Sequence, residues 1–299
     1  MKRSLLVGLL LLGVILLSSC GLRTESNNYY YSPSWIRAGA IIYIGQTSNV
    51  NKDILGSQVS SSYTEWVKTI YPAGTGESSV LWDATGAPPY AMTASPVTDY
   101  VAYGDDLRSG LYRKVVVRNI ASGTHTGLEL TELAFNPGVK SFDWSNDGTK
   151  LVYCTTAEVR TVDIDGGNDT LVTAESNLEF VAWKYGARIA FIRTSGSDKL
   201  LSVIYSSGSG RVDLLASASV DLPQISSANT NEVFGINGGN LAKVDVSAGT
   251  PATTTVKASF TGVLPRLSPD AANVTYSKSS ETSGIYSLAV ATGTETNVK

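Results

Sequence analysis

The side chains that most often carry catalysis are sparse in this sequence. Histidine occurs once, at His125, beside Gly123 and Thr124. A typical zinc site needs further ligands of this kind, and a serine–histidine–carboxylate triad would have only this base. No Gly-x-Ser-x-Gly segment presents a serine nucleophile, and no glycine loop followed by Lys-Ser or Lys-Thr binds phosphate. We therefore interpret His125 as a solvated loop residue, and we expect neither a metal nor a cofactor.

Two groups of carboxylates offer other chemistry. The first group consists of Asp163, Asp165, Asn168 and Asp169. Clustered oxygen ligands suit calcium, but the spacing departs from an EF-hand loop, and Asp and Asn also stabilise tight turns. We expect a turn here. The second group, Asp105-Asp106, has the residue types of a glycosidase or lyase, although one sequence does not show two acids facing one cleft.

The N-terminus has the order of residues found in a secretory signal peptide. Lys2 and Arg3 precede an uncharged apolar run, Leu5–Leu17, which is shorter than the roughly 20 residues of a membrane span. The run ends in Leu17-Ser-Ser-Cys20, which resembles the lipobox of bacterial lipoproteins. This resemblance implies that residues 1–19 are a cleaved signal peptide, that Cys20 carries a lipid, and that residues 20–32 are a tether to the membrane.

The residues around the lipidation site also indicate a location. Gly21, and not an aspartate, follows Cys20. By resemblance to enterobacterial sorting, this implies the outer membrane in a host that has one, with the protein facing the periplasm or the cell surface. With Cys20 lipidated, Cys154 has no partner for an internal disulfide, and its apolar neighbours predict a buried thiol.

Composition narrows the class of protein further. Charged residues make up 16% of the 299-residue chain, against roughly 25% in an average soluble protein, and the net charge is −3. Ser, Thr, Gly and Asn fill the difference, which is common in exported β-rich proteins. Nucleic-acid binding relies on a concentrated positive surface, and the chain has no basic run, so we set that function aside.

Short apolar runs separated by turn residues predict an all-β chain, and these runs repeat. One column pairs an apolar residue with an aromatic eight or nine positions later. Its pairs are Trp35 and Tyr43, Ala94 and Tyr103, Trp144 and Tyr153, Trp183 and Phe191, Ile225 and Phe234, and Leu267 and Tyr276. A second column consists of glycines in tight turns between a third and a fourth strand. These are Gly86, Gly123, Gly167, Gly208, Gly249 and Gly293.

Both columns have six members, and most spacings are close to the roughly 40–50 residues of a four-stranded propeller blade. We therefore predict an all-β protein in which residues 33–299 form a β-propeller of four-stranded antiparallel blades. Six blades are preferred, and an alternative division of the first repeat gives seven. Each sheet has two apolar faces, so Trp144 and Trp183 are expected to be buried between adjacent sheets.

Part of the repeat resembles a known family. The segment Phe142-Asp-Trp-Ser-Asn-Asp-Gly-Thr-Lys-Leu-Val-Tyr153 is similar to the TolB-like (WD40-like) propeller repeat, and Leu264-Pro-Arg-Leu-Ser-Pro-Asp270 and Ala94-Ser-Pro96 echo it. The first, fourth and fifth copies depart from the pattern. The resemblance covers most of residues 33–299 and implies a fold more than a function. The family's periplasmic member works by docking to envelope proteins.

Two departures concern the ends of the predicted ring. Blade one carries extra length, which we place as an insertion over residues 45–78. Extra length in a repeat often lies on the binding face, and this stretch carries Tyr63, Trp66 and Tyr71 as a candidate binding surface. The alternative is that these aromatics cover an edge of blade one. The outermost strand of the last blade is either 294–298 or an N-terminal strand near 29–31.

These observations favour a non-enzymatic, lipid-anchored cell-envelope propeller that binds a protein partner or acts as a scaffold. Its expected partners are the membrane, through the lipid on Cys20, and an unknown envelope protein or glycan. The alternative is a carbohydrate-active enzyme or a glycan-binding propeller that uses the central channel and aromatic loops.

Overall fold

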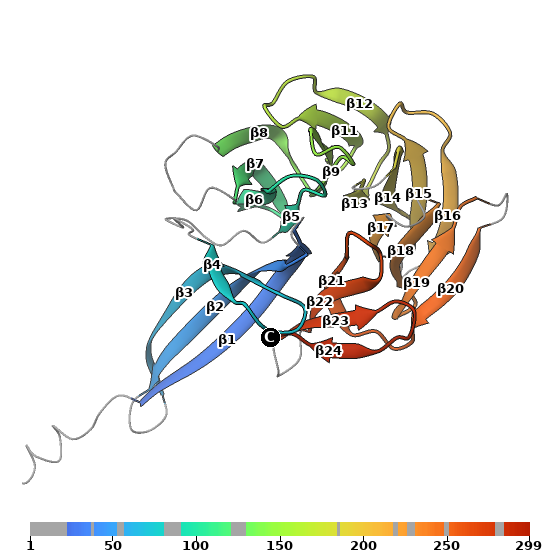
Figure 1. Ribbon diagram of the computed structural model, residues 1–299. Helices are drawn as coiled ribbons and strands as arrows, with labels where there is room; N and C mark the ends of the chain where they lie inside the picture. The colour runs from blue at the N-terminus through green and yellow to red at the C-terminus, as the bar shows by residue number, and fades with distance from the viewer. Residues whose placement is uncertain are drawn as a thin grey trace, which may run out of the picture. The chain divides into compact units, whose positions relative to one another are not determined.

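A computed structural model describes residues 23–36, 39–52, 57–80, 91–120, 130–183, 186–217, 221–225, 231–247, 251–278 and 284–299. In these ranges every regular element is a β-strand (Figure 1), so the prediction of an all-β chain is confirmed. Cys20 and His125 lie outside them. No helix within the described ranges has the length and apolar character that are needed to cross a bilayer.

The strands form six sheets of four, and each sheet uses four consecutive strands. Blades one to three are β1 (Arg23–Trp35), β2 (Ile41–Lys52), β3 (Gln58–Ile70) and β4 (Ser78–Val80); β5 (Met92–Ala94), β6 (Tyr100–Arg108), β7 (Leu111–Asn119) and β8 (Leu130–Val139); and β9 (Ser141–Trp144), β10 (Lys150–Cys154), β11 (Glu158–Asp163) and β12 (Thr170–Ala174). Blades four to six are β13 (Leu178–Ala182), β14 (Arg188–Ser195), β15 (Asp198–Tyr205) and β16 (Val212–Ser217); β17 (Asp221–Ile225), β18 (Glu232–Asn237), β19 (Asn240–Asp245) and β20 (Ala252–Lys257); and β21 (Gly262–Leu267), β22 (Asn273–Lys278), β23 (Ile285–Ala289) and β24 (Glu295–Asn297). The chain is a six-bladed β-propeller, as predicted.

The chain divides into two compact units. The described residues within 23–29 and 45–65 form the first, and those within 30–44 and 66–299 form the second, which holds the propeller. Strands β1, β2 and β3 contribute to both units. The first unit is polar, with hydrogen bonds such as Asn51 to Ser60 (3.0 Å) and an ion pair between Lys52 and Glu25 (2.6 Å). Residues from Arg23 onward in the expected tether are therefore in strand β1.

Burial falls from the first strand of a blade to the last. All four residues of β9 are buried, whereas β24 is exposed throughout. The first strands meet near the propeller centre (Figure 1), where every face is covered by other blades. The outer strands keep alternating or fully polar sequences because they face solvent.

A hydrophobic cluster lies at each of the six junctions between neighbouring blades. Trp144 is fully buried between blades two and three, and Trp183 lies in the cluster between blades three and four. Both burial predictions are confirmed. Because each blade covers the faces of its neighbours, the core is continuous around the ring, and no single blade can bury its own apolar faces.

The turn glycines agree with the prediction in three blades. Gly167, Gly208 and Gly293 lie between the third and fourth strands of blades three, four and six. Gly123 and Gly249 lie outside the described residues. The assignment of Gly86 to the hairpin of blade one is wrong, because β4 already ends at Val80 and pairs with β3. The turn between them contains Gly74 and Gly76, both with positive φ, which glycine adopts without strain.

The extra length of blade one, predicted as one insertion over residues 45–78, is divided between the two units. Residues 45–65 belong to the first unit, whereas the end of β3 from Trp66 and the turn at 71–77 belong to the propeller unit. The ends of the chain are also placed. β24 is the outermost strand of blade six, and β1 is the innermost strand of blade one. The ring therefore closes without exchange of strands between its two ends.

Side chains of blades one and six hold the closure together. Trp35, Tyr43 and Ile70 of blade one pack with Ile285 and Val298 in one buried cluster. Beside it, the Glu77 carboxylate accepts a hydrogen bond from the Tyr43 hydroxyl (2.5 Å) and pairs with the ammonium groups of Lys299 (3.0 Å) and Lys68 (3.1 Å). These contacts join the β3–β4 turn to the last residue of the chain.

The Glu77 contacts predict an acid-sensitive contribution to stability. The hydrogen bond from Tyr43, with smaller contributions from Lys299 and Lys68, lowers the pKa of Glu77 from 4.5 to about 2. Its contribution is therefore complete above pH 4.5 and is lost as the pH falls to about 2. We expect wild type to melt at a higher temperature than Glu77→Gln at neutral pH, with the difference shrinking across this window. A difference that stays constant down to pH 2, or a Tyr43→Phe variant whose acid dependence matches wild type, would contradict this interpretation.

Candidate binding site

The predicted aromatic surface divides between the two units. Trp66 packs edge-on against Tyr43, with ring centroids 5.7 Å apart, and the Lys68 ammonium lies 4.6 Å from the Trp66 ring centroid. Tyr71 is 49% exposed at the start of the β3–β4 turn. Tyr63 belongs to β3 in the first unit, and its side chain is outside the described part. Within the propeller unit, Trp66 is partly buried against the cluster between blades one and six, while Tyr71 faces solvent.

The Ser-x-Asp turns of the repeat have a structural role. The Ser145 hydroxyl donates to Asp147 (2.7 Å) and accepts from the Lys150 amide (2.9 Å), and Asp147 also accepts from the Thr149 amide (3.0 Å). The hydrogen bond from Ser145, followed by that from Thr149, lowers the pKa of Asp147. The same bonds recur in blade six between Ser268 and Asp270 (2.6 Å). These ionised turns fix the loops between the first and second strands.

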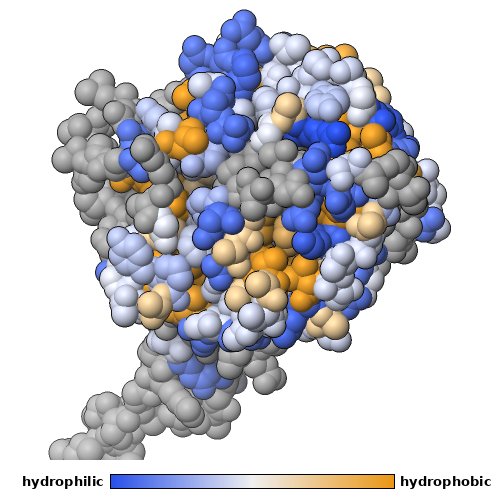
Figure 2. All heavy atoms as spheres, turned by 45° about the vertical axis from the view of Figure 1, so that its right-hand side comes forward, coloured by the Kyte–Doolittle hydropathy of each residue, from blue (hydrophilic) through white to orange (hydrophobic). Residues whose placement is uncertain are grey.

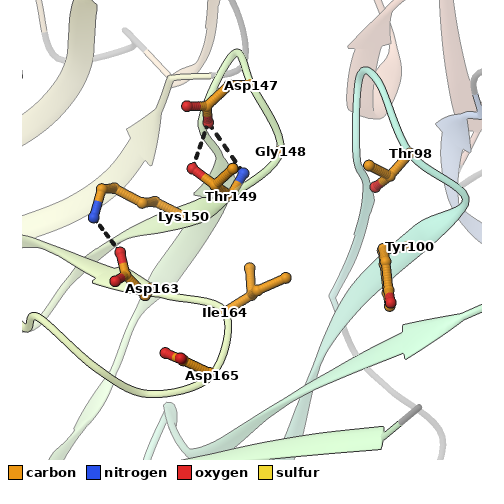
Figure 3. Close-up of a pocket in the computed structure, with 9 residues that line it drawn as sticks. All are labelled: Thr98, Tyr100, Asp147, Gly148, Thr149, Lys150, Asp163, Ile164 and Asp165. Carbon is orange, nitrogen blue, oxygen red and sulfur yellow. Dashed lines mark hydrogen bonds and ion pairs between the residues drawn. The ribbon is translucent and has the colours of Figure 1, made fainter.

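Such fixed loops line a cleft of about 570 Å³ between blades two and three (Figure 3). Thr98 and Tyr100 come from the β5–β6 connection and the start of β6, and residues 147–150 come from the β9–β10 turn and the start of β10. Residues 163–165, from the end of β11 and the following turn, complete the lining. One loop of blade two and two loops of blade three thus meet at one end of the propeller.

The predicted turn after β11 is present in this lining. Asp163 forms an ion pair with Lys150 and accepts a hydrogen bond from the Asn168 amide (2.6 Å). Asp165 accepts from the Gly167 amide (2.9 Å), and Asp169 accepts from the Tyr153 hydroxyl (2.9 Å). The pKa of Asp163 is lowered, chiefly by Lys150. Each acid therefore has its own local partner, as expected of a tight turn.

The cleft has an excess of negative charge. Its lining carries the carboxylates of Asp147, Asp163 and Asp165 and the single ammonium of Lys150, a net charge of −2. Asp163 forms an ion pair with Lys150, and Asp147 accepts hydrogen bonds within its own turn. Asp165 is exposed and accepts a hydrogen bond from the Gly167 amide within its own turn. The arrangement suits donors and cations of a docked surface, and Tyr100 and Ile164 add apolar area beside them.

Other candidate residues from the sequence do not join this cleft. Cys154 is fully buried, as predicted, and burial raises the pKa of its thiol to about 12, which makes it a poor nucleophile. Asp105 lies in β6, but the side chain of Asp106 is outside the described part, so the pair remains a prediction. Among the described residues, no three His, Cys, Asp or Glu side chains group as metal ligands would.

A second cleft of about 590 Å³ lies between blades five and six, and its lining includes Val256, Ala272 and Val290, with Lys243 as the one charged side chain. Figure 2 shows one face on which apolar atoms appear in patches between hydrophilic side chains. The most exposed large apolar side chains that the structure describes are Val59, Tyr71, Val97, Leu107, Leu171, Tyr205 and Val212. They come from many strands and loops, and scattered apolar residues of this kind are normal on a soluble surface. We take the cleft between blades two and three as the candidate site because its lining gathers four charged side chains, whereas the cleft between blades five and six has one.

Comparisons with known proteins agree with the fold. TolB from Acinetobacter baumannii has a similar structure, with a TM-score of 0.60, 11% identity, and coverage of 92% of this chain and 79% of that one. A chain of a nidogen/laminin complex gives 0.58 at 9% identity over 91% and 92%. An oligogalacturonate lyase in complex with manganese gives 0.51 at 13% identity over 94% and 81%. WD40 domains are also among the similar structures.

No protein-family model and no curated protein matches the sequence. At identities this low, likeness to solved structures shows the fold alone, because a propeller hosts many unrelated functions. The resemblance to TolB-like repeats is confirmed at the level of the propeller. The sequence singled out Asp163 and Asp165 only as part of a turn, and the cleft was missed because its lining comes from loops of two blades, although the Ser-x-Asp turn marks where such loops are fixed.

Proposed function

We propose that this protein is a lipid-anchored, non-enzymatic β-propeller of the cell envelope. We further propose that it binds a protein partner through the acidic cleft between blades two and three. The observation that carries this proposal is the cleft itself: three loops, locked by internal hydrogen bonds, present the exposed carboxylate of Asp165 beside apolar area. Loops that are already ordered lose little entropy on binding, which favours recognition of a partner.

The chemistry of the cleft supports a protein surface with lysine or arginine side chains as the partner. A net charge of −2 speeds encounter with a cationic surface and disfavours an acidic one. The anchor is supported by the order of charge, apolar run and Cys20 at the N-terminus. The resemblance of the repeat motif to TolB-like repeats supports placement in the periplasm or envelope, and Gly21 supports the outer membrane.

Removing one charge tests the cleft. We expect full-length wild type, purified in detergent after cross-linking in cells, to retain a stoichiometric protein partner, and we expect Asp165→Asn to lose most of it. Asparagine keeps an oxygen acceptor for the Gly167 amide, so the melting temperature should change little.

Asp198→Asn is the matched control, because Asp198 is an exposed carboxylate at the start of β15 in blade four, next to the β14–β15 turn. It should retain the partner as wild type does. Equal capture by wild type and both variants would rule out the cleft as the contact. Turnover of glycans by the purified protein would instead support the carbohydrate-active alternative.

A further inference from the structure

The residue just before the apolar column of the repeat lies at the centre of the propeller, and in two blades this residue is charged. Thr93, Asp143 and Arg266 each directly precede the first member of the apolar column, in the innermost strands β5, β9 and β21. All three are buried, with exposures of 1%, 4% and 8%. Innermost strands surround the propeller axis (Figure 1), so this position forms a layer of side chains around the axis.

The acid of this layer is well satisfied. Asp143 accepts a hydrogen bond from the Thr93 hydroxyl of blade two (2.9 Å) and another from the Trp183 amide of blade four (3.1 Å). Each carboxylate oxygen therefore has a donor from a neighbouring blade. These bonds hold Asp143 against the wall of the ring and join three blades.

The base of this layer is not satisfied in the same way. The Arg266 guanidinium carbon lies 6.0 Å from the ring centroid of Phe180 in β13, although β17 stands between β21 and β13 in the ring. The side chain therefore extends toward the axis and does not lie along its own blade. Asp143 interacts with it through space, but among the described residues none accepts a hydrogen bond from the Arg266 guanidinium or forms an ion pair with it. The guanidinium nitrogens are not among the fully buried atoms without a partner, so they keep some contact with solvent.

An arginine in this state is costly. Its side chain stays charged at all working pH values and offers five N–H donors, and burial of a charge without acceptors opposes folding. Burial lowers the pKa of Arg266, because loss of water contact disfavours the charged form of the guanidinium. An anion that contacts the guanidinium would offset it, and a planar guanidinium fork matches the two oxygens of a carboxylate.

We propose that Arg266 binds a carboxylate group at the propeller axis, with the Phe180 ring as the neighbouring apolar wall. The carboxylate comes either from a free small acid or from an acidic group of a bound polypeptide, and both present the same chemistry. This site is separate from the acidic cleft, so it stands whether or not the proposed partner binds there.

Thermal unfolding of the full-length chain in detergent, in acetate or succinate against sodium chloride at equal ionic strength, tests the site. A ligand at ten times its dissociation constant should raise the melting temperature of wild type by roughly 3–5 °C, and the rise should saturate. Arg266→Met should remove the rise, because methionine keeps apolar bulk without the donors. Arg188→Met, which removes an arginine stacked on Tyr205 at the surface, should retain it.

Two further experiments distinguish a small acid from a polypeptide as the ligand and provide a second variant of Arg266. A short neutral peptide with a free C-terminus should act like acetate if a polypeptide is the source, whereas its amidated form should not. Arg266→Lys keeps the charge but loses the fork and should bind more weakly than wild type. A rise of equal size in Arg266→Met, or no saturable binding of any carboxylate to wild type by calorimetric titration, would overturn the proposal.

Discussion

Replacing Trp144 with alanine is expected to lower the free energy of unfolding by about 3–5 kcal/mol. Trp144 is fully buried in the cluster between blades two and three, and its indole N–H donates to the Thr93 carbonyl oxygen (2.9 Å). Alanine leaves a cavity at this junction and an acceptor without its donor. Denaturant unfolding and the melting temperature measure the loss.

Trp144→Phe separates the two contributions. Phenylalanine fills most of the cavity but has no N–H, so it should cost clearly less than alanine, mainly through the lost hydrogen bond. Leu107→Ala, at a side chain that is 41% exposed, should change stability by much less. A Trp144→Ala protein as stable as wild type would mean that this junction is not part of the core.

Replacing Cys20 with alanine is expected to abolish lipid attachment. Each buried methylene of an acyl chain contributes about 0.8 kcal/mol to membrane binding, and stable anchoring takes more than one chain. Cys20 is the proposed acceptor of these chains. The other cysteine of the sequence is Cys154, so no second thiol in the N-terminal segment could replace that of Cys20. Metabolic labelling with a fatty acid should give no signal from Cys20→Ala, and membrane fractionation should show the chain released or uncleaved.

Cys154→Ala is the natural control for this experiment. Its thiol is fully buried between blades three and four, so it should be inaccessible to an acyltransferase. Labelling of this variant should match wild type. Unchanged labelling of Cys20→Ala would refute the proposed anchor and would remove the sequence argument for an envelope location.

The fold was predictable because burial constrains a repeat in every copy. The first strand of a blade is covered on all sides, so an apolar residue such as Trp144 must recur there, and an aromatic such as Tyr153 must follow at the next strand. The two columns favoured six blades over seven, and the sheet topology has six. The Gly86 assignment failed because glycine marks any tight turn, and Gly74 and Gly76 close the hairpin of blade one instead.

The candidate sites were less predictable because they depend on contacts between blades. Thr98 and Asp165 are far apart in sequence and meet only when blades two and three pack together. Arg266 could have been singled out, since it occupies the same repeat position as Asp143, but its lack of an acceptor is visible only in the structure. Alignment of repeat positions predicts which side chains share a layer, but it does not predict which of them are paired.

The most direct measurement of the central claim is site-specific photo-cross-linking in cells. A photoreactive residue at position 165, in the acidic cleft, should give one discrete adduct with a protein, whereas the same residue at position 198 should give none. The account predicts this contrast, with the adduct in the membrane fraction of the cell envelope. Adducts of equal yield at both positions, or none at position 165, would contradict a protein-binding role for the cleft.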